Sequence, residues 1–200
     1  MTTKQPRVLP TTEEDWDADT SAMMAGIAAF NGGRVLNVLS TVARHPKLLK
    51  RWMPFGNHVM GGSTLPARER ELIILRTGYN ARSGYEWAQH VAIARAVGLT
   101  DGEIERVAAG PTEAGWSAGD ATLLNAVDEL ASHQCIATPT WTALRERWSE
   151  QQCIDIVFTV GQYHMISMAL NTFKVEIDEG VERFPEPEFT MGRFAGENLE

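Results

Sequence analysis

Apolar side chains recur every three or four residues along most of the chain, which is the spacing of one face of an α-helix. No run of residues alternates apolar and polar side chains convincingly enough to indicate a β-strand. The pattern therefore predicts an all-α protein. The expected helices span residues 13–30, 34–53, 66–78, 85–97, 101–109, 118–133, 139–148 and 150–176, with a break at Asn31–Gly33 between the first two.

Capping signals mark where several of these helices begin. A Ser or Thr followed three residues later by an acidic residue or Gln can satisfy the free N–H groups of a first helical turn. Proline also suits that turn, since its missing N–H would be unpaired there. The capping pairs are Thr100 with Glu103, Ser117 with Asp120 and Ser149 with Gln152, and the prolines are Pro66 and Pro139.

Length and composition fit one globular domain over residues 1–200, because 44% of the residues are hydrophobic and no tract is of low complexity. The last residues, 184–200, carry two prolines and no helical period, which indicates an extended C-terminal arm. Its Phe184, Phe189 and Phe194 would be buried best against the body of the protein or a neighbouring subunit. A frayed tail is the alternative.

The net charge of −8, with basic residues scattered among acidic ones, argues against nucleic-acid binding. The start of the chain has no signal-peptide pattern, and no segment approaches the roughly 18 uninterrupted apolar residues of a membrane span. We therefore expect a cytoplasmic protein with no membrane partner. The two cysteines, Cys135 and Cys153, form neither a C-x-x-C pair nor a zinc-ribbon spacing, which favours buried free thiols.

The segment SGYEWAQH, residues 83–90, contains the most distinctive candidate chemistry. On a helix, Glu86 and His90 share one face because they are four residues apart, and Ile93 and Val97 continue that face as an apolar stripe. Two ionisable groups thus point toward the core. An ordinary capping or surface pair is the alternative, since a glutamate in a first turn also favours the helix dipole.

The preceding segment RERELIILRT places Glu71 in a helix that is apolar on nearly every side, so we expect its carboxylate to be at least partly buried. A buried carboxylate without a partner costs several kcal/mol or takes up a proton. Glu71, Glu86 and His90 would therefore satisfy one another or a ligand. Such an arrangement shifts pKa values as a general acid or base requires.

Other candidates have simpler explanations beside the functional one. Ser83 and Trp87 are candidates to bind the substrate, and Ser83 could also be a nucleophile. A Ser-Gly pair before a helix is commonly a turn with an N-cap, however, and Trp87 could be a core aromatic. The remaining histidines show no metal-binding spacing, so we expect no metal and no cofactor. These isolated histidines are His45, His58 and His133.

A weak internal duplication relates two segments of the chain. Residues 71–78 and 153–161 are both apolar, end in glycine and lead toward a tyrosine and a histidine. The second pair is Tyr163 with His164, and Tyr163 is added to the substrate-binding candidates on this basis. The chain could therefore consist of two pseudo-repeated helical halves.

The run from Arg68 to Val107, RERELIILRTGYNARSGYEWAQHVAIARAVGLTDGEIERV, resembles the signature region of the carboxymuconolactone decarboxylase family, which has the all-helical fold of the alkyl hydroperoxidase AhpD. The later GQYHMISMALNTFKVEID is similar to the second helical hairpin of longer family members. The resemblance implies a homo-oligomer, a trimer or hexamer, with the site near subunit contacts. AhpD-type members carry E-x11-C-x2-C-x3-H, and this chain has Ser83 and Glu86 where those cysteines would stand.

The resemblance, together with the missing sulfur, favours a decarboxylase-like lyase over a thiol peroxidase. We expect acid–base chemistry on a small carboxylic acid or lactone, as in aromatic compound catabolism, with His90 donating a proton and Glu71 and Glu86 orienting it. Arg76 and Arg82 are candidates to bind the substrate carboxylate, or else surface ion pairs. The alternatives are a hydroperoxide reductase that uses Cys135 or Cys153, and a non-catalytic oligomer that binds small acids.

Large apolar side chains cluster in the first third of the chain, upstream of the proposed site. Some must complete the core, and we expect the rest to cover the pocket around His90 or a neighbouring subunit. The cluster consists of Met23, Met24, Ile27, Phe30, Trp52, Met53, Phe55 and Met60.

Overall fold

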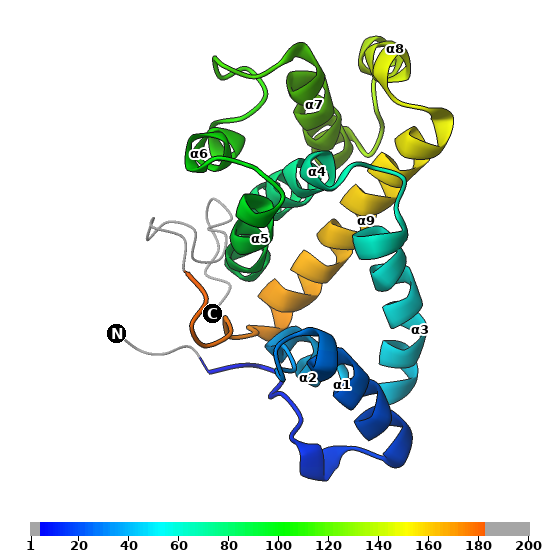
Figure 1. Cartoon of the computed structure of the whole chain (residues 1–200), viewed down its shortest axis with the longest axis vertical. Coiled ribbons are helices and arrows are strands. Elements are labelled where there is room, and N and C mark those ends of the chain that lie inside the picture. Colours follow the sequence, from blue (N-terminus) through cyan, green and yellow to red (C-terminus); the bar gives the residue numbers. More distant parts are fainter. Residues whose placement is uncertain (1–4, 183–200) are drawn as a thin grey trace.

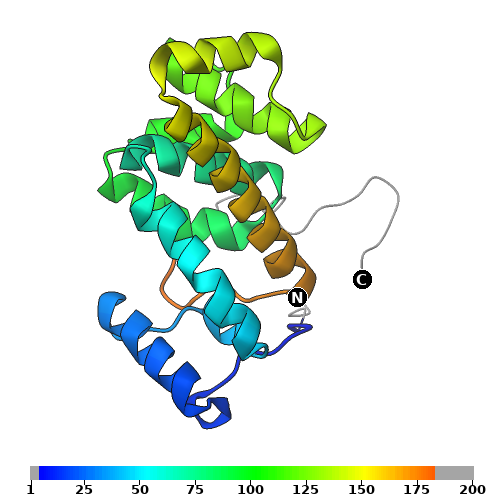
Figure 2. The ribbon, with the colours of Figure 1, turned by 90° about the vertical axis from the view of Figure 1, so that its right-hand side faces the viewer.

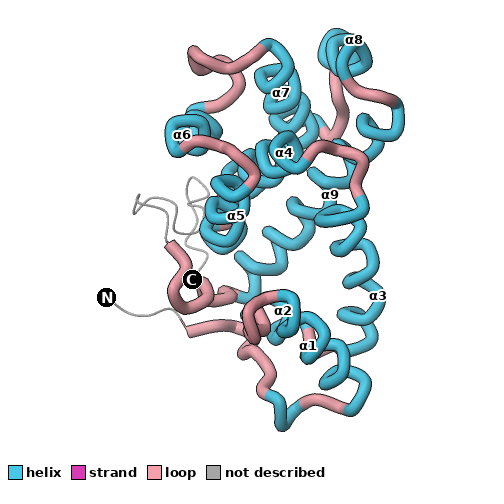
Figure 3. The backbone as a smooth tube through the Cα atoms, viewed as in Figure 1, coloured by secondary structure: helices cyan, strands magenta, loops and turns pink. Residues whose placement is uncertain are grey.

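The computed structural model describes residues 5–182, and within that range every regular element is helical (Figure 3). The predicted all-α fold is therefore confirmed. The predicted arm over residues 184–200 lies outside the described part of the chain. The α-helices are α1 (Ala18–Phe30), α2 (Asn37–Val42), α3 (Pro46–Asn57), α4 (Ala67–Asn80), α5 (Gly84–Ala96), α6 (Asp101–Ala109), α7 (Ala118–His133), α8 (Thr138–Arg147) and α9 (Glu150–Phe173).

The single helix expected over residues 34–53 is wrong, because the chain breaks between α2 and α3. Pro46 occupies the first turn of α3, where a proline is tolerated at the start of a helix but not in its interior. His45 caps that start through its Nδ1 atom, which accepts a hydrogen bond from the Leu48 N–H at 3.3 Å. The cap at His45 and the proline at position 46 therefore explain why the chain starts a new helix so soon after α2 ends.

The start and the end of the N-terminal third also differ from the expectation. A 3-10 turn, Glu13–Asp15, precedes α1, which begins at Ala18 after the Asp17 carboxylate accepts a hydrogen bond from Thr20 N–H at 2.8 Å. A π-helical turn, His58–Gly62, follows α3 and was not expected.

Helix α9 is one continuous element, which confirms the single helix predicted over residues 150–176 except at its last residues. The helix passes through Gly161 without a turn. After α4, in contrast, Arg82 adopts a left-handed φ of 52° and Ser83 caps α5, which reverses the chain. Residues 153–161 and 71–78 thus share an apolar pattern but not a following turn.

Two buried apolar clusters make up the core, and α4 and α9 contribute to both. Figure 1 shows α6, α7 and α8 toward one end of the molecule and α1 and α2 toward the other, with α9 running between them. The first cluster joins α4 to α5, α6, α7, α8 and the first half of α9. The second joins α1, α2, α3 and the π-turn to the second half of α9, and Figure 2 shows α3 running beside α9. Within α4, Leu75 belongs to the first cluster and Ile74 to the second, so the junction of the two cores lies along this helix.

Helix α9 is, by length and composition alone, apolar enough to cross a membrane. Half of that apolar window is buried inside the protein, as expected for the core helix of a globular bundle. The expectation of no membrane partner remains a prediction.

Candidate functional site

A tight turn brings α5 back along α4 and sets up the site. Ser83 N–H donates to the Gly78 carbonyl at 2.9 Å, and the Ser83 hydroxyl accepts from Glu86 N–H at 3.4 Å as an N-cap. Gly78 lies where the two helices touch: a Cβ there would stand 3.4 Å from the Cβ of Glu86. This close approach lets the polar side chains of α4 and α5 meet in the interior.

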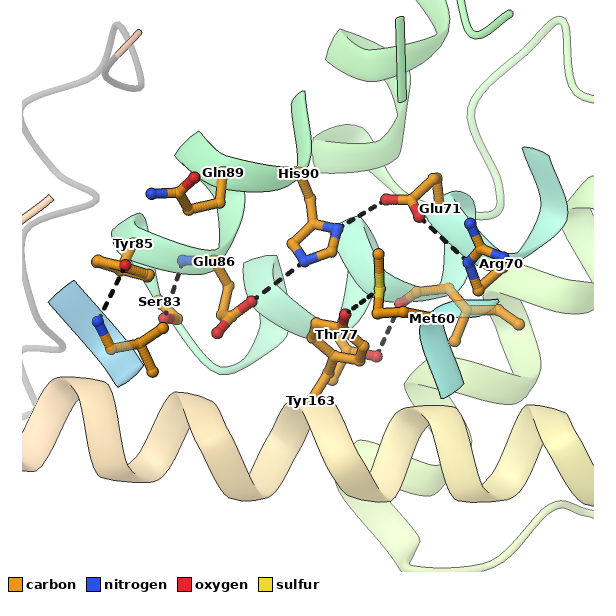
Figure 4. Close-up of polar contacts among 12 residues, drawn as sticks. Met60, Arg70, Glu71, Thr77, Ser83, Tyr85, Glu86, Gln89, His90 and Tyr163 are labelled. Carbon is orange, nitrogen blue, oxygen red and sulfur yellow. Dashed lines mark hydrogen bonds and ion pairs between the residues drawn. The ribbon is translucent and has the colours of Figure 1, made fainter. Parts of the chain in front are cut away.

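His90 and Glu71 form the centre of the site (Figure 4). His90 Nδ1 lies 2.7 Å from Glu71 Oε2, and the Glu71 side chain is fully buried. An ionised carboxylate can only accept, so Nδ1 donates this hydrogen bond and the other ring nitrogen, Nε2, is directed away from Glu71. Glu71 therefore fixes the orientation of the imidazole.

Glu86 lies on the other side of the imidazole, with Oε2 3.5 Å from His90 Nε2. Burial raises the pKa of Glu86 to about 7; the charge of His90 opposes this rise, and that of Glu71 adds to it. Near neutral pH the Glu86 carboxyl group thus exchanges a proton readily. It has the properties required of a general acid or base.

The pKa of His90 lies above its ordinary value. Burial lowers this pKa, but the hydrogen bond to Glu71 and the charges of Glu71 and Glu86 outweigh that effect. The positive charge of Arg70 opposes them. The imidazole is consequently disposed to hold a proton between its two carboxyl partners.

Tyr163 of α9 covers the imidazole from the second core. Its ring packs edge-on against His90, with ring centroids 4.9 Å apart and an interplanar angle of 89°. The Tyr163 hydroxyl lies 2.8 Å from Met60 Sδ of the π-turn, toward which it can donate. Burial raises the pKa of Tyr163 well above its ordinary value, so the phenol stays protonated. Tyr163, a candidate for binding the substrate, therefore lies against the imidazole.

Arg70 also reaches the site, although the sequence analysis did not select it. Its Nε atom donates to Glu71 Oε1 at 3.3 Å, and 11% of its side chain is exposed. The signal in the sequence was its position directly before Glu71 in RERE. That signal was missed because arginine beside glutamate usually forms a surface pair.

Arg76 and Arg82, the two arginines predicted to bind the substrate carboxylate, make no contact with the imidazole of His90 or its two carboxyl partners. Arg76 forms a paired contact with Asp128 at 2.7 and 2.8 Å and donates to two backbone carbonyls, which supports the ion-pair explanation. Arg82 is exposed in the turn between α4 and α5. Trp87 is buried in the first core against Tyr79, which supports the core explanation.

Within residues 5–182, the two ring nitrogens of His90 contact carboxylate oxygens and no sulfur atom. Cys153 is buried near the start of α9, ten residues or roughly 15 Å of helix before Tyr163. Cys135 is exposed in the loop after α7, so the prediction that it is buried is wrong. Both thiols are free, as expected.

No metal site competes with this arrangement within residues 5–182, where no group of three His, Cys, Asp or Glu side chains is placed to hold an ion. The large side chains of the first third mostly pack into the second core. Among them, Met60 contacts Tyr163, and Trp52 Nε1 donates to Gln162 Oε1 at 3.1 Å.

Comparison with known proteins finds a family match for the segment that contains the site. Residues 46–129, which contain Glu71, Glu86 and His90, match the carboxymuconolactone decarboxylase family. The family resemblance is confirmed over this segment of the chain. No curated protein matches the sequence.

Solved structures share the fold over most of its length. An AhpD-core, peroxidase-related protein of Ralstonia eutropha JMP134 is 19% identical, with a TM-score of 0.76 over 92% of this chain and 94% of its own. A peroxidase-related protein of Silicibacter sp. TM1040 is 18% identical, with a TM-score of 0.76 over 90% and 96%. A variant of the debrominase Bmp8, in complex with 2,3,4-tribromopyrrole, is 14% identical, with a TM-score of 0.73 over 88% and 94%. These likenesses establish an AhpD-like fold.

Proposed function

We propose that this protein is an acid–base lyase that decarboxylates a small unsaturated carboxylic acid or lactone. The observation that carries the proposal is a buried imidazole held between two carboxyl groups, one at 2.7 Å and one at 3.5 Å. Such a positioned group can hold a proton and deliver it to a reacting atom. The family match of residues 46–129 supports the same class of chemistry.

The proposed reaction has two steps. The C–C bond to the leaving carboxylate breaks, carbon dioxide departs, and the electron pair stays on the substrate as a delocalised enolate-type carbanion. His90 Nε2–H then gives its proton to carbon, and the protonated Glu86 restores it to the imidazole. Overall, the substrate exchanges a carboxylate for a hydrogen, and one proton enters from solvent.

The residues around the imidazole have distinct parts in this scheme. Glu71 stabilises the imidazolium and fixes its ring, while Tyr163 and the apolar surroundings exclude water from the carbanion. A dry site also favours loss of the charged carboxylate as neutral carbon dioxide.

The test is carbon dioxide release from a panel of unsaturated lactone acids, comparing the wild type with His90→Gln. We expect the variant to lose turnover by about 100-fold or more, because a positioned acid contributes roughly that much. Circular dichroism and thermal unfolding should show that the fold is retained. Undiminished turnover in His90→Gln would refute the assignment.

A hydroperoxide reductase is the competing function, since two of the similar structures are described as peroxidase-related. Here it would have to use Cys135 or Cys153, because peroxide reduction through a thiolate requires sulfur. The double variant Cys135→Ala, Cys153→Ala serves as the control in the same assays. Peroxidase activity that disappears in this variant, without any carbon dioxide release by the wild type, would favour the competing function.

We also propose that the chain forms a homo-oligomer, with α9 in the contact. Its exposed apolar residues recur at alternating spacings of four and three, the pattern of a helix–helix seam, and each of the four large side chains is between 45% and 55% exposed. The seam consists of Ile154, Phe158, Gly161, Met165 and Met168.

This contact differs from the one expected in the first third of the chain, whose large side chains are mostly turned inward. Light scattering should report more than one subunit for the wild type at micromolar concentration. The variant Phe158→Glu, Met165→Glu should reduce the mass to that of a monomer. A monomeric wild type would contradict the proposal.

A further inference from the structure

Arg70 has hydrogen-bonding capacity that no described residue uses. Its guanidinium group carries five N–H bonds, and only the one on Nε is directed at a described acceptor, Glu71 Oε1. Neither Nη1 nor Nη2 makes a hydrogen bond to any residue within 5–182. Figure 4 shows Arg70 beside Glu71, on the side opposite His90.

The Nη atoms of Arg70 keep some contact with solvent, since among the described residues the buried side-chain polar atoms without a partner are Thr41 Oγ1 and Ser167 Oγ. Arginine does not lose its proton in proteins, so its charge cannot be removed when it leaves water. The side chain of Arg70 is only 11% exposed. Arg76, with a similar exposure of 10%, engages all three nitrogens with Asp128 and two carbonyls. Arg70 thus keeps donors that no described residue accepts from and that an anion could use.

The charges around Arg70 point to an anion as the missing acceptor. Glu71 divides its carboxylate, with Oε2 on His90 and Oε1 on Arg70. When His90 and Glu86 both carry their protons, the negative charge of Glu71 faces the positive charges of His90 and Arg70. An anion beside Arg70 would restore neutrality.

Arg70 is connected to the reacting imidazole through Glu71, whose Oε2 contacts His90 while its Oε1 accepts from Arg70. The guanidinium fork matches a carboxylate in two parallel hydrogen bonds, which fix orientation as well as position.

We propose that Arg70 binds a carboxylate of the substrate through Nη1 and Nη2 and positions the substrate beside His90. The assignment rests on the proposed lyase function for its catalytic meaning, but the binding itself does not. The carboxylate held here is the one that stays on the product. A guanidinium bound to the leaving carboxylate would stabilise the ground state and oppose the loss of carbon dioxide. The favoured substrates therefore carry two carboxylates.

The binding test uses sodium benzoate as the probe and benzamide as its uncharged match. Both are titrated while the ring signals of His90 are followed by NMR, with assignment from His90→Gln. We expect a saturable shift with benzoate and none with benzamide. In Arg70→Gln the benzoate affinity should fall by about tenfold to 100-fold, as expected for loss of hydrogen bonds to a charged group.

Two further variants separate recognition from a general effect on charge or folding. Arg70→Lys keeps the charge but not the fork, so its affinity should lie between those of the wild type and Arg70→Gln. Arg34→Gln removes an exposed arginine from the turn between α1 and α2 and should bind as the wild type. Undiminished affinity in Arg70→Gln, or no saturable shift in the wild type, would overturn the proposal.

Kinetics test the catalytic part separately. With a dicarboxylate lactone substrate, Arg70→Gln should raise KM by about tenfold or more, whereas a monocarboxylate lacking the retained group should be affected by less than about threefold. If benzoate binding depends on Arg70 while the wild type releases no carbon dioxide from any lactone acid, the anion site stands and the lyase function fails.

Discussion

Two buried ionic clusters lie along α4, and they differ in how completely their charges are matched. Around Arg76, every guanidinium nitrogen has an acceptor, and Asp128 also accepts from Asn80 at 2.7 Å. Around Glu71, two carboxyl groups share one imidazole, one contact is as long as 3.5 Å, and Arg70 has unused donors among the described residues. The protein itself pairs every donor nitrogen of the first cluster, whereas the second has donors on Arg70 that no described residue accepts from and that the proposed anion would use.

Breaking the complete cluster should have the larger effect on stability. Asp128→Ala leaves the Arg76 charge buried without its partner, and we expect the free energy of unfolding to fall by about 3 kcal/mol. Urea denaturation at pH 7 measures this loss. Carbon dioxide release per folded molecule should stay within about threefold of the wild type.

A matched control comes from an exposed ion pair. Asp19 and Lys50 lie 3.2 Å apart with side chains 81% and 71% exposed, so Asp19→Ala should change the free energy of unfolding by less than about 1 kcal/mol. An equally small loss in Asp128→Ala would show that the two clusters do not differ as described.

The incomplete cluster should reveal itself through pH. The pKa of Glu86 is raised from its ordinary 4.5 to about 7, so its stabilising contribution is fully present below pH 4.5 and is lost as the pH rises through 7. Glu86→Gln cannot ionise. We therefore expect the variant to gain about 2 kcal/mol of unfolding free energy relative to the wild type between about pH 5 and pH 8.

Urea denaturation at several pH values across that range measures the difference. Parallel pH profiles for Glu86→Gln and the wild type would mean that Glu86 is solvated as an ordinary surface glutamate. The raised pKa of Glu86, on which the proposed acid–base role depends, would then be refuted.

Local signals in the sequence predicted much of the fold. Helices α6 and α7 begin and end where expected, because Thr100 and Ser117 cap them within their own first turns. The break between α2 and α3 was missed, since His45 is an unusual cap that the apolar period does not reveal.

The site was predictable to the extent that it depends on helical spacing. Glu86 and His90 share a face of α5, and the apolar residues around Glu71 in the sequence correctly predicted that its side chain is buried. The different fates of Arg70 and Arg76 were not predictable. They depend on which side chains of α7 and which carbonyls in the last turn of α6 approach α4, and those contacts form only in the folded chain.

The contact at Gly78 has a consequence for how this site can change over generations. A methyl group there would already touch Glu86 and the backbone of Trp87, so a longer side chain would have to point elsewhere or separate α4 from α5. Mutation at this position would leave every acid and base of the site chemically unaltered. It would change the distance over which a proton passes between them, although the mutated glycine contributes no side chain to the site.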